Sequence, residues 1–199
     1  MVGRDRFPVA LAMIQPEPMP GSYRNDGMGI DEVVERALAE AQMLADNGFD
    51  GYIIQNRNDA PVLQRANVET IAYMTRVALE LRRAFPQLIQ GILVNWDGEA
   101  SLAVADAAGS DFMEHTYTSV EVGYAGLMHA QCVDVLALKK RLGSKVPVFA
   151  DVQEVHYEQL CGKSVVDNAW DTVMNAFADG LFVGGHSLAE SMELVRAVR

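Results

Sequence analysis

Short apolar runs alternate along the chain with longer segments in which apolar residues recur every three or four positions. The short runs occupy residues 9–14, 51–54, 89–94, 112–116, 146–152 and 181–183. The amphipathic segments run from about residue 30 to the Asn47-Gly48 pair and over residues 68–85, 100–108, 130–142, 165–178 and 188–199. Short bounded apolar runs predict buried strands, and a period of 3.6 residues predicts helices. The alternation therefore predicts six βα units that build a parallel sheet.

The predicted strands are apolar at consecutive positions, which is typical of strands whose two faces are both covered. This pattern favours one α/β domain over residues 1–199, folded as a TIM-type (β/α) barrel. A complete barrel takes eight units and about 250 residues, so the predicted barrel is incomplete and lacks two C-terminal units. Three explanations stay open: the chain is part of a longer polypeptide, a partner chain closes the barrel, or the strands form an open doubly wound sheet.

The composition indicates a globular protein and argues against nucleic-acid binding and against a membrane-spanning helix. Half of the 199 residues are hydrophobic and 22% are charged, as in packed globular domains. The net charge of −11 opposes binding to nucleic acid. No apolar stretch approaches the roughly 20 residues of a transmembrane helix, so we expect a cytoplasmic protein. Cys132 and Cys161 are too far apart for a metal or redox motif, and we expect both to be reduced, buried thiols.

Polar residues follow the predicted strands. In parallel α/β folds the carboxyl ends of the strands meet at one edge of the sheet, and ligands bind there. We therefore predict that these residues bind a small-molecule ligand: Gln15, Gln55, Asn56, Asp59, Asn95, Glu114, Asp151, His156, Gly184 and Gly185. Helix capping or turn formation is an alternative role for Asp59, and it is the expected role for Asp97.

Three of these residues are candidates for catalysis. Glu114 lies within an apolar strand, where an isolated carboxylate is costly unless it has a partner or a ligand. Asp151 ends the next apolar strand and His156 follows it, so the three side chains form a predicted acid/base set. Alternatively the three side chains hold a divalent cation through oxygen and imidazole ligands, although their spacing matches no metal motif, and the sequence identifies no cofactor. Gly184-Gly185 at a strand end resembles a backbone cradle for phosphate.

Several segments are similar to one known family. Residues 18–22, Pro-Met-Pro-Gly-Ser, match its P-L-P-G-S loop after the first strand. Residues 48–61 match its G-x-D-G…E-N…D-x-P stretch, and residues 109–112 and 149–152 add weaker similarity. These segments, in this order, resemble the BtpA/SgcQ family over nearly the whole chain. The resemblance implies a barrel fold.

The chain departs from the family pattern at four strand ends. Gln15 stands where the family tends to have His, Gln55 where it has Glu, Glu114 where it has Arg, and Val155 where it has Lys. The resemblance therefore identifies a divergent member. The replacements remove positive charge and add a carboxylate, which weakens the attraction of the site for phosphate.

These observations lead to competing hypotheses for function. The clustered polar residues favour an enzyme acting on a small polar metabolite, such as a sugar phosphate or a nucleoside-like ligand. The photosystem I role for which the family is named implies the alternative of a non-catalytic assembly factor. A further hypothesis is a homo-oligomer in which a neighbouring subunit supplies the missing strands.

Overall fold

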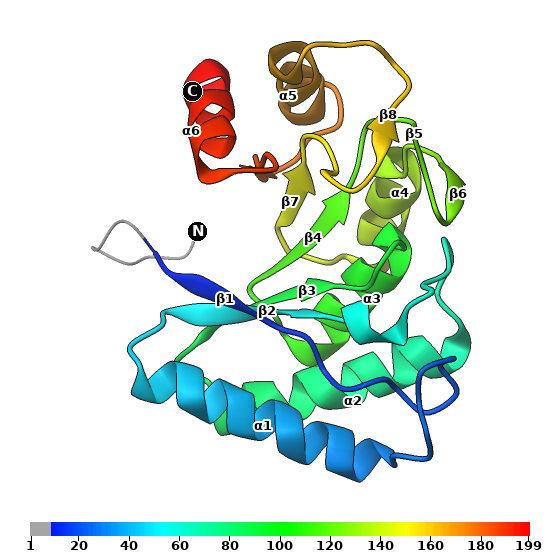
Figure 1. Ribbon diagram of the computed structural model, residues 1–199, viewed down its shortest axis with the longest axis vertical. Helices are drawn as coiled ribbons and strands as arrows, with labels where there is room; N and C mark the ends of the chain where they lie inside the picture. The colour runs from blue at the N-terminus through cyan, green and yellow to red at the C-terminus, as the bar shows by residue number, and fades with distance from the viewer. Residues whose placement is uncertain (1–8) are drawn as a thin grey trace.

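A parallel six-stranded sheet forms the centre of the molecule in the computed structural model, which describes residues 9–199 (Figure 1). Its strand order is β1-β2-β3-β4-β7-β9, and every neighbouring pair is parallel. The strands are β1 (Leu11–Ile14), β2 (Gly51–Gln55), β3 (Ile89–Leu93), β4 (Phe112–Thr116), β7 (Val148–Asp151) and β9 (Gly180–Phe182). The six parallel strands predicted from the alternating pattern are thus confirmed.

A helix follows each of the six strands and lies outside the curled sheet (Figure 1). The helices are α1 (Ile30–Asp46), α2 (Val68–Ala84), α3 (Gly98–Ala108), α4 (Cys132–Leu142), α5 (Val165–Met174) and α6 (Leu188–Val198). Helix α5 ends four residues before the predicted position. The chain breaks from the helix there because Phe177 adopts a left-handed φ of 57°.

Strand alternation divides the core into two layers. Ile54, Ile92 and Met113 point outward and pack against the helices. Ile53 and Phe112 point inward and pack with other apolar residues on the concave face of the sheet. The outer layer holds the helices to the sheet, while the inner layer forms the base of a partial barrel.

The sheet does not close. Within residues 9–199, β1 pairs only with β2 and β9 only with β7, so the prediction of an incomplete barrel is confirmed. The prediction that both faces of every strand are covered is wrong for β1, because Met13 on its inner face is 43% exposed. No strand crosses the concave face opposite Met13 in the described part of the chain.

A second, antiparallel sheet lies in the loops, where no strands were predicted. It consists of β5 (Glu121–Gly123), β6 (Gly126–Met128) and β8 (Glu158–Gln159), in the order β6-β5-β8. Strands of two or three residues are too short to show a period. Pairing of β5 with β8 brings the loop after β4 against the loop after β7.

Both cysteines are free thiols, but the prediction that both are buried is wrong. Cys161 is exposed and Cys132 is half-buried. Cys161 follows β8 in a surface loop, whereas Cys132 begins α4 and packs, partly buried, against the outer layer of the core. Among the described residues, no helix combines the length and the apolar character needed to cross a membrane.

Candidate functional site

A cavity of about 310 Å³ opens on the concave face at the carboxyl ends of the strands. Six of the predicted site residues line it: Gln15, Gln55, Glu114, Asp151, His156 and Gly184. Arg57, Trp96, Glu154 and Phe182 complete much of its wall. We call this cavity the inner cavity.

Glu114 and Asp151 come from adjacent strands of the sheet. In the register of β4 and β7, Glu114 is opposite Phe149 and Thr116 is opposite Asp151. Because side chains two residues apart share a face, both carboxyls point to the concave side. Glu114 is only 9% exposed, and its Oε2 has no hydrogen-bond partner among the described residues.

The surroundings of these two carboxyls favour their protonated forms. Burial, together with the negative charge of Glu154, raises the pKa of Glu114 to about 7. Burial and then the charges of Glu114, Glu154 and Glu121 raise the pKa of Asp151 well above its usual range, while a hydrogen bond from Thr116 lowers it. Two such carboxyls near neutral pH can serve as a proton donor and a proton acceptor.

Glu121 belongs to this acidic group, although the sequence did not suggest it. It is 1% exposed, and its Oε1 accepts hydrogen bonds from the Ser119 hydroxyl at 2.7 Å and the Glu154 backbone amide at 3.3 Å. Burial raises its pKa. The one available signal is a carboxylate in a run of otherwise small or apolar residues, and this signal is weak without knowledge of the second sheet.

A row of side-chain amides crosses the ends of β1, β2 and β3. Gln15 Nε2 donates to Gln55 Oε1 at 2.8 Å, and Gln55 Nε2 donates to Asn95 Oδ1 at 3.3 Å. The row lies beside the inner cavity and offers both donors and acceptors to a ligand.

Asn56, Asp59 and Asn95 line a second cavity of about 190 Å³. Asp59 Oδ1 accepts from the Met19 amide at 2.7 Å, and Asn56 Nδ2 donates to Asp59 Oδ2 at 3.2 Å. Asn56 Oδ1 accepts from the Asn95 amide at 2.8 Å. These bonds join the loops after β1, β2 and β3. The structure thus divides the predicted constellation between two cavities.

The glycine pair after β9 has its neighbouring amides engaged within the chain. The Gly185 amide donates to Ser191 Oγ at 2.9 Å, and the His186 amide donates to Glu190 Oε2 at 2.7 Å. Ser187 Oγ accepts in turn from the Glu190 amide at 3.2 Å and so caps the start of α6. A carboxylate of the chain itself therefore occupies the position where a phosphate cradle was predicted.

His156 lies at the rim of the inner cavity. Its side chain is exposed, and its backbone amide donates to Glu154 Oε1 at 2.9 Å. Among the residues that the structure describes, no group of three or more His, Cys, Asp or Glu side chains is arranged to hold a metal ion.

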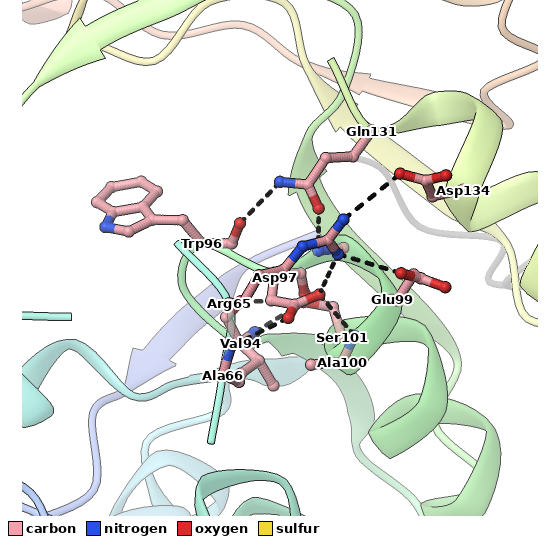
Figure 2. A network of polar contacts seen from close by, with 11 residues as sticks. Arg65, Ala66, Val94, Trp96, Asp97, Glu99, Ala100, Ser101, Gln131 and Asp134 are labelled. Carbon is pink, nitrogen blue, oxygen red and sulfur yellow. Dashed lines mark hydrogen bonds and ion pairs between the residues drawn. The ribbon is translucent and has the colours of Figure 1, made fainter. Parts of the chain in front are cut away.

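A network of polar contacts around Asp97 fixes the loop that carries Asn95 and Trp96 (Figure 2). Asp97 is 5% exposed and accepts from the Ala100 amide, which confirms its predicted role as a helix cap. It also accepts from the Ala66 amide at 3.0 Å and pairs with Arg65 at 3.2 Å. Gln131, drawn above it in Figure 2, donates to the Trp96 carbonyl and accepts from the Gly98 amide, both at 3.0 Å.

Replacing Asp97 with alanine is expected to lower the free energy of unfolding by about 2–4 kcal/mol. The substitution removes the cap of α3 and leaves the Ala66 and Ala100 amides without their acceptor. Urea denaturation measures the loss. Glu99→Ala is the matched control, since Glu99 pairs with the same Arg65 at a more exposed position and should cost less than about 1 kcal/mol. Equal losses in the two variants would contradict the role given to Asp97.

Comparison with solved structures supports the fold. Dihydrodipicolinate synthase from Bacillus clausii superposes with a TM-score of 0.54 at 14% identity, over 96% of this chain and 58% of that one. The aldolase QR15 superposes with a TM-score of 0.51 at 15% identity, over 82% of this chain and 66% of that one. At these identities the similarity shows a shared TIM-type architecture alone.

Comparison of sequences shows the family. The photosystem I biogenesis protein BtpA of Synechocystis is 30% identical over 170 residues, 84% of this chain and 59% of that protein. An uncharacterized protein of Thermococcus kodakarensis is 29% identical over 92% of this chain and 70% of its own length. The sgc region protein SgcQ of Escherichia coli is 25% identical over 93% of this chain and 69% of its own length. Residues 8–198 match the BtpA family as a whole, and the chain therefore belongs to that family as a divergent member.

Proposed function

We propose that this chain is an enzyme that transfers protons on a small, hydroxyl-bearing metabolite bound in the inner cavity. The observation that carries the proposal is the pair Glu114 and Asp151, two carboxyls on adjacent strands that face one cavity and are both biased toward protonation. Paired titratable groups of this kind are typical of acid–base sites.

The pair provides both partners of a proton transfer. For a substrate with a hydroxyl group beside a carbonyl, the deprotonated carboxyl takes the proton from the hydroxyl-bearing carbon. The protonated carboxyl gives its proton to the carbonyl oxygen, which forms an enediol. Reversal of the two transfers on the neighbouring carbon yields the isomer, and both carboxyls return to their starting states.

The remaining lining residues suit such a substrate. The amides of Gln15 and Gln55 offer donors and acceptors to hydroxyl groups. Trp96 and Phe182 supply apolar surface against which a carbon skeleton can pack.

Exchange of substrate carbon-bound hydrogen with deuterium oxide tests the proposal. The chain is incubated with aldoses, ketoses, their phosphates and hydroxy acids, and deuterium uptake is followed by NMR. Glu114→Gln and Asp151→Asn should each reduce the exchange rate by about 10²–10⁴-fold, because each removes one partner of the transfer. The matched controls Glu193→Gln and Asp106→Asn alter exposed helix residues and should exchange like the original chain. Unchanged exchange in Glu114→Gln would contradict the proposal.

A non-catalytic assembly role is the second candidate. The observation that favours it is the exposed apolar surface of α5, the turn that follows it and α6, where Trp170 is 58%, Phe177 68% and Leu188 81% exposed. Surfaces of this kind mark protein–protein contacts, either with another protein or with a second copy of the chain. Copurification of a partner that persists when Glu114 and Asp151 are both replaced, without deuterium exchange in the original chain, would favour this candidate.

A further inference from the structure

The charged groups that face the base of the inner cavity are mostly acidic. Glu114 on β4, Asp151 on β7 and Glu154 in the following loop line the cavity, and Glu121 on β5 lies next to them. None of these four carboxyls forms an ion pair with a Lys, Arg or His side chain of residues 9–199. Such a group of carboxyls is costly to bury without a compensating cation.

The side chain of Glu114 gives separate evidence that the inner cavity binds a ligand with a hydrogen-bond donor. Its side chain is 9% exposed, it lines the cavity, and its buried Oε2 receives no hydrogen bond from the described part of the chain. Buried carboxylate oxygens are nearly always satisfied in folded proteins. A ligand that brings an N–H or O–H group to this oxygen would satisfy it.

The basic groups near the cavity do not fill this role. Arg57 lines the wall, but the charges that shift the pKa values of Glu114 and Asp151 are all carboxylates. His156 is exposed at the rim. The amide of Gly185, one of the two glycines expected to receive an anion, already binds Ser191, and the next amide, that of His186, binds the Glu190 carboxylate. The site is therefore complementary to a cation rather than to a phosphate.

Building on the enzyme function above, we propose that the substrate carries an ammonium group that binds between Glu114, Asp151 and Glu154. An ammonium has three N–H donors and no acceptor, which matches three carboxyls and the unpartnered Glu114 Oε2. Amide side chains and Trp96 in the same wall suit the hydroxyl groups and carbon skeleton of an amino sugar or amino alcohol. A metal ion fits less well, since its bonds to oxygen are shorter than the hydrogen bonds of an ammonium, and no three His, Cys, Asp or Glu side chains of residues 9–199 converge closely enough to hold a metal.

Matched pairs of probes test this substrate class. Titration calorimetry at about pH 7.5 compares the binding of glucosamine with that of glucose, and the binding of 1-amino-1-deoxysorbitol with that of sorbitol. Glucose 6-phosphate and magnesium chloride are titrated as controls for an anion and a metal ion. The amine of at least one pair should bind at least about tenfold more tightly than its hydroxyl counterpart. Glu114→Gln should remove most of this preference, whereas Glu193→Gln, on an exposed face of α6, should retain it.

The release of protons on binding provides a second test of the ammonium group. An ammonium group beside Glu114 and Asp151 favours the ionised form of one carboxyl of the pair, so binding should release up to one proton while the other carboxyl keeps the proton that the transfer requires. The apparent binding enthalpy of the amine should then depend on the ionisation enthalpy of the buffer, and this dependence should shrink in Glu114→Gln.

The following results would overturn the proposal that the substrate carries an ammonium group. Equal or tighter binding of glucose, sorbitol or glucose 6-phosphate would do so, as would absence of amine binding up to about 10 mM. Binding of magnesium that is tighter than that of both amines would assign the carboxyls to a metal instead. Deuterium exchange on a neutral substrate, combined with any of these results, would leave the proposed enzyme function intact while removing the ammonium group from it.

Discussion

Glu114→Gln is expected to stabilise the folded chain at about pH 8 by about 3 kcal/mol and to leave its stability at about pH 4.5 nearly unchanged. The pKa of Glu114 is raised from 4.5 to about 7 in the folded state, so folding favours the protonated carboxyl. The stability contributed by this proton is fully present below 4.5, declines as the pH rises through 7, and is lost above it. Glutamine stays neutral throughout and avoids the cost of burying the charge.

Urea denaturation of the original chain and the variant at the two pH values measures this difference in free energy, and thermal denaturation measures it as a shift in Tm. The increase in Tm should be about 2–4 °C for each kcal/mol in a chain of this size. Glu193→Gln is the control, because its exposed carboxyl should give the same small change at both pH values. A destabilised Glu114→Gln at about pH 8 would mean that the carboxylate has a favourable partner in the folded chain, contrary to the burial argument.

Gly51→Ala is expected to lower the free energy of unfolding by at least about 3 kcal/mol, or to prevent folding. Gly51 begins β2, between β1 and β3, and a Cβ atom there would lie 2.1 Å from the Ile89 carbonyl oxygen and 2.6 Å from Ile89 Cβ. A backbone oxygen in a sheet cannot rotate away as a side chain can. The strands must therefore separate or the new side chain must distort the register.

Gly29→Ala is the matched control for this substitution. Gly29 precedes α1 with φ −78°, which alanine adopts readily, and its Cβ would meet no atom within 4 Å. Thermal and urea unfolding of both variants should show a loss below about 1 kcal/mol for Gly29→Ala. A Gly51→Ala protein as stable as this control would show that β2 and β3 are not packed as described.

The predicted stability cost of Glu114 bears on function. At position 114 the chain carries a carboxyl that is expected to destabilise the folded state at neutral pH, although one substitution to glutamine would remove this cost. Groups of this kind cluster at binding and catalytic sites, where a ligand compensates for the unfavourable environment. The stability experiment and the deuterium exchange experiment therefore examine the same side chain from two independent directions.

The sequence alone determined the order and type of the main elements. The alternation of apolar runs with helical periods identified all six parallel strands and their helices, because these patterns arise locally from side-chain geometry. Short motifs in the sequence also identified the family. The helix cap at Asp97 was predictable because a capping side chain contacts a backbone amide only three residues away. The incomplete barrel followed from counting the units.

Tertiary structure decided how the polar strand ends are distributed. Gln55 and Asn56 are adjacent in the chain, yet Gln55 lines the inner cavity and Asn56 the second one, because successive side chains point in opposite directions. Glu121 joins the acidic group only through the pairing of β5 with β8, two segments far apart in the sequence. The exposure of Cys161 and the engagement of the Gly185 amide by Ser191 likewise depend on packing between segments, which no local pattern encodes.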